Sequence, residues 1–245
     1  MVALQDRPPD GVSPGRCDSR LSYAPGMTAE GRPPLRYVAL GDSYTIGTGV
    51  DPAVSWPVQL VGALASAADS RGTLELVANL GVNGYTSGQL VRDELPALDR
   101  LRPGFASLLI GVNDVVRGVP AATYAANLRT TLTALLARLA ADRIVTVAIP
   151  DYTVTPRGAA FGDPAQQRRE IAAFNAIMAG QSAERGIRHV DIADLAARAA
   201  TDPRLVAADG LHPSGAQYGL WVERIAPVVA GMLAGMPPEV SDRPA

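Results

Sequence analysis

Short apolar runs alternate with longer amphipathic stretches along this chain, and this alternation limits the fold more than any other feature of the sequence. Each run is nearly continuous in hydrophobicity and is closed by Gly, Pro or Asp, as expected for strands buried on both faces. Five such runs are present: LRYVAL (35–40), LELVANL (74–80), FASLLIG (105–111), RIVTVAIP (143–150) and RHVDI (188–192).

The stretches between these runs are typical of helices. In one of them Leu128, Leu132, Leu135 and Leu139 form an apolar stripe at three- and four-residue spacing. A strand–helix repeat of this kind predicts an α/β domain with a parallel sheet and helices on both faces. The expected helices cover residues 55–68, 86–101, 123–141 and 163–186, and a last one runs from about residue 214 to residue 233.

The ends of the chain differ from its centre. Residues 1–34 are rich in Pro and Gly and lack periodicity, so they are expected to form a flexible leader. Met27 stands just before the globular part and offers a second candidate for the translation start. We expect a single domain over residues 35–236, followed by a C-terminal tail at 237–245.

Composition narrows the function classes. Binding of nucleic-acid phosphates needs a basic face, and a net charge of −2 gives no reason to expect one. No apolar run approaches the roughly 20 residues of a membrane helix. The first residues, MVALQDRPPDG, contain charged residues and prolines where a signal peptide would have its apolar core. The sequence therefore predicts a cytoplasmic protein without stable membrane insertion.

Missing residue types exclude several cofactors. All 22 basic residues are arginine, so the chain has neither a Schiff-base lysine nor the lysine of a phosphate-binding P-loop. The single cysteine, Cys17, lies in the leader, and only His189 and His212 are available as histidine ligands. We therefore expect neither a metal nor an organic cofactor.

Ligands of parallel sheets bind beyond the carboxyl ends of the strands, so the loops after residues 40, 80, 110, 149 and 192 are the ones to search. The first loop, GDSYTIG, places Ser43 just past a strand, where its hydroxyl is exposed to a substrate. In isolation, Asp42 and Ser43 are better explained as the caps of a turn.

The next two loops carry candidate hydrogen-bond donors. In NLGVNGYTSG, Gly81 or Gly84 can direct a backbone N–H at a developing negative charge, although both also suit an ordinary turn. In LLIGVNDVVRG, Asn113 offers a neutral amide donor, for which an Asx-turn is the alternative.

The segment ADGLHPSG (208–215) contains an acid and a base three residues apart. Asp209 can accept from one imidazole nitrogen of His212, which fixes the tautomer and stabilises the imidazolium formed when a serine loses its proton. His189 lies inside the strand-like RHVDI and is expected to be structural.

Together, these four segments resemble the GDSL lipase/esterase group, also called SGNH hydrolases, over about residues 35–234. The resemblance implies a three-layer, flavodoxin-like fold with a five-stranded parallel sheet of order 2-1-3-4-5. It implies Ser43 as nucleophile, His212 as base and Asp209 as its partner. It also implies an oxyanion hole formed by Ser43 N–H, Gly84 N–H and Asn113, with Gly81 as the alternative glycine. Tyr44 stands where the family name has leucine.

The implied activity is hydrolysis of carboxylic esters through an acyl-enzyme. The short loops after the first three strands favour small acyl groups on soluble alcohols. Two alternatives stay open: a related carbohydrate-binding module without turnover, and a flavodoxin-like phosphate or nucleotide binder. Thioesters and lysophospholipids also stay open as substrates, because a fold does not select among them.

Overall fold

A computed structural model describes residues 33–66 and 73–235. The expected C-terminal tail and nearly all of the expected leader lie outside the described residues, as do the last two residues of the first expected helix. The expected domain boundaries are therefore not tested by the structure.

Five parallel strands form one sheet of order β2-β1-β3-β4-β5, which confirms the predicted order. Each strand coincides with one of the five apolar runs. Their bounds are β1 Leu35–Gly41, β2 Leu74–Asn79, β3 Phe105–Leu109, β4 Ile144–Val147 and β5 Arg188–Val190.

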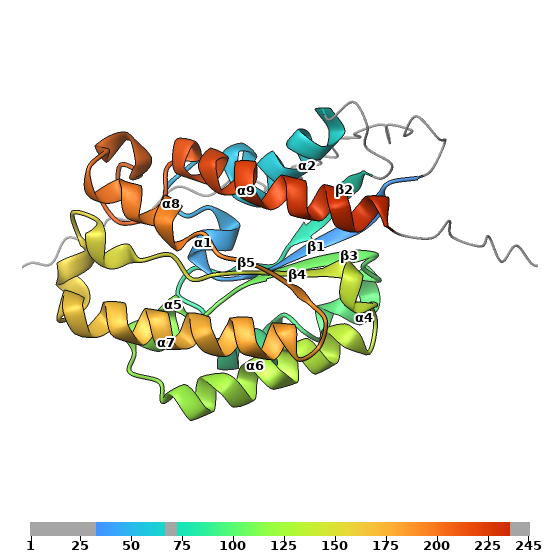
Figure 1. Cartoon of the computed structure of the whole chain (residues 1–245), viewed down its shortest axis with the longest axis horizontal. Helices are drawn as coiled ribbons and strands as arrows, with labels where there is room; N and C mark the ends of the chain where they lie inside the picture. Colours follow the sequence, from blue (N-terminus) through green and yellow to red (C-terminus); the bar gives the residue numbers. More distant parts are fainter. Residues whose placement is uncertain (1–32, 67–72, 236–245) are drawn as a thin grey trace, which may run out of the picture.

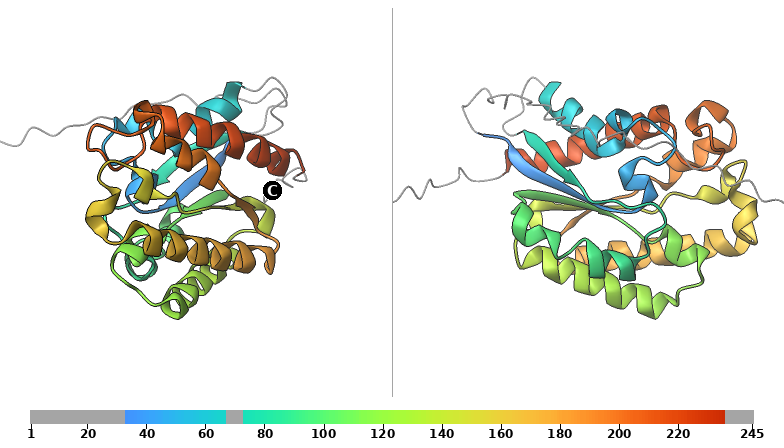
Figure 2. Two further views of the ribbon diagram at one scale, coloured as in Figure 1. Left: turned by 60° about the vertical axis from the view of Figure 1, so that its left-hand side comes forward. Right: turned by 180° about the vertical axis from the view of Figure 1, so that it is seen from behind.

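Helices cover both faces of the sheet, so the fold is a three-layer α/β/α sandwich (Figure 1). One layer contains α2 (Trp56–Ser66) and α9 (Gly215–Ala234), which pack against each other. The opposite layer contains α6 (Ala121–Leu136) and α7 (Pro164–Ala183). The view from behind shows the same two layers enclosing the strands (Figure 2).

The expected helix at 86–101 is wrong as one element, because the chain forms two helices there, α3 (Ser87–Asp93) and α4 (Ala97–Leu101). Pro96 lies at the break and acts as the N-terminal cap residue of α4. Proline lacks an N–H and its ring clashes with the preceding turn, so it does not continue a helix.

Short helices follow the carboxyl ends of the strands. They are α1 (Ser43–Ile46) after β1, α5 (Val112–Val116) after β3 and α8 (Ala193–Ala197) after β5. The loop after β4 contains two 3₁₀ segments, Tyr152–Val154 and Gly158–Phe161. Further 3₁₀ segments are Pro52–Val54, Ala141–Arg143, Arg198–Ala200 and Pro203–Leu205.

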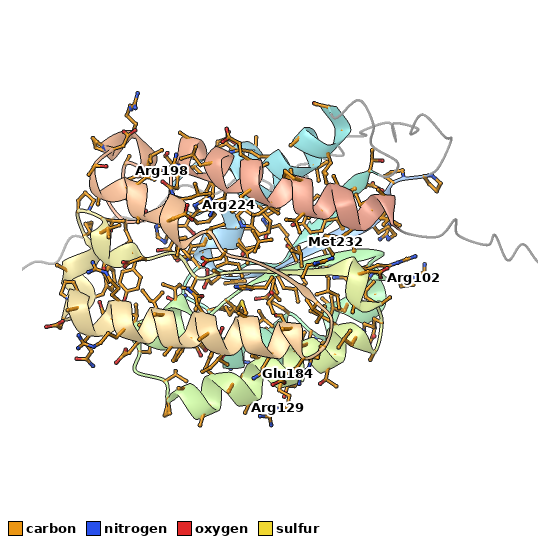
Figure 3. All side chains as sticks on the ribbon, in the orientation of Figure 1. Arg102, Arg129, Glu184, Arg198, Arg224 and Met232 are labelled. Atoms are coloured by element: carbon orange, nitrogen blue, oxygen red, sulfur yellow. The ribbon has the colours of Figure 1, made fainter. Side chains whose placement is uncertain are left out.

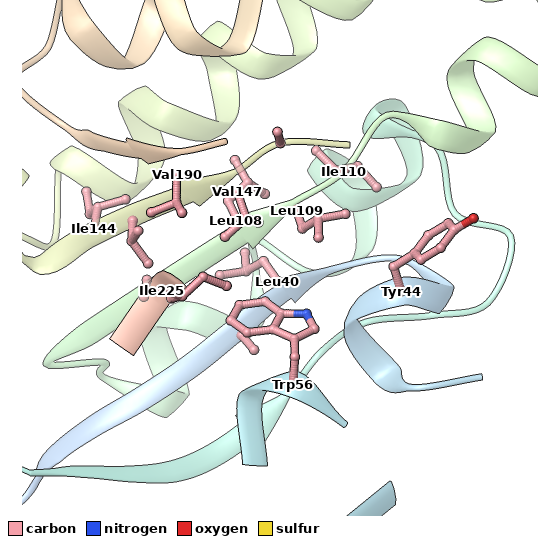
Figure 4. Packing of buried hydrophobic residues seen from close by; sticks show 14 of the residues in the cluster. Leu40, Tyr44, Trp56, Leu108, Leu109, Ile110, Ile144, Val147, Val190 and Ile225 are labelled. Atoms are coloured by element: carbon pink, nitrogen blue, oxygen red, sulfur yellow. The ribbon is translucent and has the colours of Figure 1, made fainter. Parts of the chain in front are cut away.

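The core lies between the sheet and the helices. The predicted leucine stripe is buried: Leu128, Leu132 and Leu135 of α6 are fully buried, and Leu139, just past the end of the helix, is 6% exposed. On the other face, Trp56 is fully buried in the same cluster as Leu40 and Ile225 (Figure 4). Charged side chains such as Arg129 and Glu184 project outward (Figure 3).

Among residues 33–66 and 73–235, no helix combines the length and the hydropathy needed to cross a membrane.

Candidate active site

Ser43 begins the helix that directly follows β1. The β1 strand ends at Gly41, Asp42 caps α1, and Ser43 is the first helical residue. The Asp42 carboxylate accepts from Tyr44 N–H at 3.0 Å, which fixes the turn. The Ser43 N–H donates to no other described residue. The nucleophile candidate is thus presented by a capped turn at the carboxyl end of a central strand.

Only glycine fits at the position where β1 ends. Gly41 has φ +153°, and an added Cβ would lie 2.2 Å from the Leu109 carbonyl oxygen and 2.3 Å from Thr45 Oγ1. A side chain at this position would push α1 away from β3. The glycine before Asp42 and Ser43 therefore allows the turn that carries Ser43 to pack directly on the neighbouring strand.

Two buried carboxyl groups lie beside this turn. Asp42 is fully buried and Glu94 is 3% exposed. Glu94 Oε2 accepts from Gly41 N–H at 3.0 Å. Burial raises the pKa of Asp42 to about 8, although the hydrogen bond from Tyr44 N–H acts to lower it. Burial also raises the pKa of Glu94 to about 9, although the hydrogen bond from Gly41 N–H acts to lower it. Burial therefore favours the protonated form of both groups.

Asp209 and His212 form a close pair in the loop before α9. His212 Nδ1 lies 2.6 Å from Asp209 Oδ2, while Asp209 Oδ1 accepts from the N–H groups of His212 and Leu211. Because an ionised carboxylate only accepts, Nδ1 carries the proton and Nε2 of a neutral ring keeps its lone pair. The loop is closed by a hydrogen bond from Ala207 N–H to the His212 carbonyl at 2.8 Å.

The electrostatics of this pair keep Asp209 ionised. Burial alone would raise its pKa, but the hydrogen bonds from the His212 ring and from the Leu211 and His212 N–H groups outweigh that effect. The net result is a pKa below the ordinary range of an aspartate. An ionised Asp209 next to the ring can stabilise a positive charge on His212.

The two candidate glycines of the second loop differ in their surroundings. Gly81 N–H already donates to Asn79 Oδ1 at 3.1 Å, and a Cβ at Gly81 would lie 2.8 Å from the Asp42 carbonyl oxygen. Gly81 therefore serves close packing against the turn that carries Asp42 and Ser43. Gly84 has φ +82°, and its N–H donates to no other described residue. Of the two glycines, Gly84 is therefore the one whose backbone N–H is available to a substrate atom.

The Asn113 side chain is oriented by the same loop. Its Nδ2 donates one hydrogen to the Tyr85 carbonyl at 2.9 Å, which leaves the second hydrogen of the amide for another acceptor. Arg117, at the end of α5, donates to the Gly84 carbonyl at 2.7 Å. The second and third loops are thus tied together next to Asn113.

A further clamp joins these two loops below the surface. The fully buried Asp114 accepts from Ser87 N–H at 2.8 Å and from Ser87 Oγ at 2.6 Å. Burial raises the pKa of Asp114, and the hydrogen bonds from Ser87 oppose this shift. The clamp holds the N-terminus of α3 against α5, so the segment carrying Gly84 keeps its place relative to Asn113.

One cavity of about 190 Å³ brings together three of the five predicted site residues, Ser43, Asn113 and His212. Asp209 lies behind His212, and the cavity wall includes Asn83, the neighbour of Gly84. The wall consists of Ser43, Tyr44, Asn83, Val112, Asn113, Val116, Tyr152, Phe161, Leu211 and His212. Residues far apart along the chain therefore meet at the carboxyl edge of the sheet.

Sequence reasoning missed Tyr152 and Phe161, which come from the loop after β4. The position of that loop, after a strand's carboxyl end, was a usable signal. The segment carries no motif that distinguishes its aromatic residues from core residues, because their placement depends on the two 3₁₀ segments.

His189 lies in β5, where its Nδ1 is 3.0 Å from Thr146 Oγ1, in keeping with the expected structural role. Burial lowers the pKa of His189, against the charge of Asp191. Within the described ranges, no group of three His, Cys, Asp or Glu side chains is arranged to hold a metal ion.

The family of the chain follows from its sequence over most of this domain. The model of the GDSL-like lipase/acylhydrolase family matches residues 39–220. The chain belongs to this family. The resemblance inferred from the four motifs is therefore confirmed, and the protein is a member of a hydrolase family. A comparison with curated proteins found no significant match.

Solved structures share the fold of this GDSL family member. TesA superposes with a TM-score of 0.63 at 22% identity, covering 80% of this chain and 99% of TesA. The acetylxylan esterase Axe2 from Geobacillus stearothermophilus superposes with a TM-score of 0.61 at 20% identity, covering 83% of this chain and 95% of Axe2. A third structure is the psychrotrophic esterase EstA from Pseudoalteromonas sp., inhibited by monoethylphosphonate. It superposes with a TM-score of 0.60 at 19% identity, covering 82% of this chain and 99% of EstA. At these identities the likeness shows a shared fold.

Proposed function

We propose that this protein is a serine esterase that hydrolyses carboxylic esters through an acyl-enzyme. The observation that carries the proposal is the 2.6 Å contact between Asp209 Oδ2 and His212 Nδ1, with His212 lining the same cavity as Ser43 and Asn113. A base and a hydroxyl in one cavity, with an ionised acid that orients the base from behind, are the requirements of nucleophilic acyl transfer.

Acylation begins when Ser43 Oγ attacks the ester carbonyl carbon. His212 Nε2 takes the hydroxyl proton as the new C–O bond forms, and Asp209 stabilises the imidazolium. The tetrahedral intermediate then breaks its bond to the alcohol oxygen. His212 returns the proton to that oxygen, so the alcohol leaves neutral and the acyl group stays on Ser43.

The negative charge of the intermediate is met by three donors. We assign these to Ser43 N–H, Gly84 N–H and the Asn113 amide. The two backbone N–H groups have no acceptor among the described residues, and Asn113 has a hydrogen to spare. Gly81 is the weaker assignment, because its N–H is engaged by Asn79. Donors held in place before the reaction need no reorganisation in the transition state.

Deacylation repeats the sequence with water. His212 takes a proton from water, the resulting oxygen attacks the acyl carbon, and the Ser43 ester bond breaks. His212 gives the proton back to Ser43 Oγ, and the carboxylic acid leaves. The enzyme ends in its starting protonation state.

The acyl group is proposed to be small. The cavity of about 190 Å³ is smaller than the roughly 300–1,000 Å³ that hold drug-sized ligands, and Val112, Val116 and Phe161 form part of its wall. The structural neighbours described as esterases agree with an ester substrate. A cytoplasmic location remains the expectation from the sequence.

The test is hydrolysis of a series of p-nitrophenyl esters from acetate to palmitate. We expect the highest kcat/KM for the shortest acyl groups and loss of turnover in Ser43→Ala. Ser66→Ala, at an exposed position of α2, is the matched control and should keep full activity. A folded wild-type protein that hydrolyses none of these esters would favour the two alternatives, the carbohydrate-binding module and the phosphate or nucleotide binder.

A further inference from the structure

Glu94 is the residue through which α3 contacts the end of β1. It is the C-terminal cap residue of α3, and its Oε2 accepts from Gly41 N–H at 3.0 Å. The registered pairing of β1 with β2 ends at Ala39 opposite Asn79, so Gly41 lies beyond it. The Glu94 side chain therefore holds a main-chain N–H where the pairing of these two strands has ended.

The contact is enclosed and lies close to Ser43 along the chain. Glu94 is 3% exposed and does not line the cavity of about 190 Å³. The residue after Gly41 is Asp42, which caps the helix that begins at Ser43. Burying a carboxyl group costs free energy that an apolar side chain of similar size would avoid. What Glu94 supplies in return is an oxygen that accepts from Gly41 N–H.

The opposite end of α3 is tied to the helix that carries Asn113. Ser87, the first residue of α3, donates to Asp114 from its N–H at 2.8 Å and from its hydroxyl at 2.6 Å. Asp114 is the neighbour of Asn113 in α5. Leu90, in the middle of α3, is fully buried and anchors the helix in the core. The helix α3 thus connects the segment that carries Ser43 with the segment that carries Asn113.

We propose that Glu94 is a positioning residue for the attack by Ser43, a role that rests on the proposed esterase function. Its oxygen holds Gly41 N–H and so fixes the end of β1 relative to α3. Ser43 and Asn113 then keep the spacing that the tetrahedral intermediate requires. A displacement of about 1 Å at a reacting group can lower a rate by about 100-fold. This role needs the acceptor oxygen of Glu94, and the volume of the side chain alone does not fulfil it.

The test compares Glu94→Gln with Glu94→Met, because both side chains are uncharged and about as long as glutamate. Gln keeps an acceptor oxygen, and Met has none. We expect kcat for p-nitrophenyl acetate to stay within about threefold of wild type in Glu94→Gln, and to fall by about 10–100-fold at unchanged KM in Glu94→Met. Labelling of Ser43 by a fluorophosphonate should slow by a similar factor in Glu94→Met. Glu75→Met, the same substitution at an exposed position of β2, is the control and should keep the wild-type kcat.

The outcomes separate this role from the proposed function. All proteins are assayed at a temperature where circular dichroism shows them folded, so that a loss of stability alone does not change kcat. A folded Glu94→Met protein with the wild-type kcat overturns the positioning role and leaves the esterase intact. An equal loss of kcat in Glu94→Gln and Glu94→Met does the same.

If Glu94→Met does not fold, Glu94→Asp replaces it, because its carboxyl group is shorter by a methylene and withdraws from Gly41 N–H. A wild-type kcat in Glu94→Asp then overturns the positioning role, and a fall at unchanged KM supports it. A folded wild-type protein that hydrolyses no p-nitrophenyl ester overturns the esterase and, with it, the role of Glu94 in that reaction.

Discussion

The Nδ1 atom of His212 lies 2.6 Å from Oδ2 of Asp209, and the same carboxylate accepts from the backbone N–H of His212. One aspartate thus fixes both the ring and the backbone of the histidine that follows it by three residues. The pair lies in a closed loop. The His212 ring also packs against the Tyr44 ring, and the centroids of the two rings are 5.6 Å apart. The orientation of the base therefore does not depend on a bound substrate.

The first prediction concerns this pair. Asp209→Asn keeps an oxygen for the two N–H groups but offers no charge to the His212 ring and can favour the wrong tautomer. We expect kcat for p-nitrophenyl acetate to fall by about 10²–10⁴-fold with the fold retained by circular dichroism. A decrease of less than about tenfold would show that Asp209 does not orient the base.

The second prediction concerns the oxyanion donors. Asn113→Ala removes the amide donor that we assign to the charge of the transition state, so kcat should fall by about 10²–10³-fold while KM changes little. Steady-state kinetics with p-nitrophenyl acetate measure both constants. A rise in KM at constant kcat would assign Asn113 to ground-state binding instead.

The third prediction concerns the glycine that ends β1. Gly41→Ala places a Cβ 2.2 Å from the Leu109 carbonyl oxygen at a φ of +153°. We expect the free energy of unfolding, measured in urea, to fall by about 2–4 kcal/mol. Gly62→Ala in α2 is the control, because an added Cβ there meets no atom within 4 Å. It should stabilise the protein by about 0.5–1 kcal/mol. Equal effects of the two substitutions would contradict the close packing of the nucleophile turn.

The fourth prediction is a pH dependence of stability. Glu94 has a pKa of about 9 in the folded protein, against 4.5 as its ordinary value, so the folded state binds more protons than the unfolded state between these values. The contribution of Glu94 to stability is complete below the unfolded pKa and is lost as the pH rises toward the folded pKa. We therefore expect the melting temperature to fall from about pH 5 to about pH 9.

Glu94→Gln tests this origin, because the amide oxygen still accepts from Gly41 N–H and the side chain no longer titrates. The decline of the melting temperature should be smaller in this variant, with a remainder from Asp42, whose pKa is about 8. Glu75→Gln, at an exposed position of β2, should keep the wild-type slope. Identical slopes in all three proteins would contradict a buried, protonated Glu94.

The strands could be predicted because a strand buried on both faces needs a continuous apolar run. The loops of Ser43, Asn113 and His212 then followed from the rule that ligands bind at the carboxyl ends. Glu94 was not recognised, because its charged neighbours Arg92 and Asp93 suggest an exposed face of a helix. Its burial follows from a tertiary contact, the hydrogen bond to Gly41 N–H.

The buried, unpartnered polar atoms of Tyr152, Gln217 and Trp221 could not be predicted for a related reason. The sequence assigns them to the core, and they are indeed buried. Their unpartnered polar atoms become visible only when α9, which carries Gln217 and Trp221, is packed together with the loop after β4, which carries Tyr152. The choice between Gly81 and Gly84 likewise depends on which N–H is already engaged.

The central claim is that Ser43 forms a covalent bond to the substrate's acyl carbon with His212 as its base. A fluorophosphonate probe followed by peptide mass spectrometry tests this claim most directly. We expect one label on the peptide containing Ser43 in wild type, and little or none in Ser43→Ala or His212→Ala. Failure of the folded wild-type protein to react, or a label on a different residue, would contradict covalent ester cleavage by Ser43.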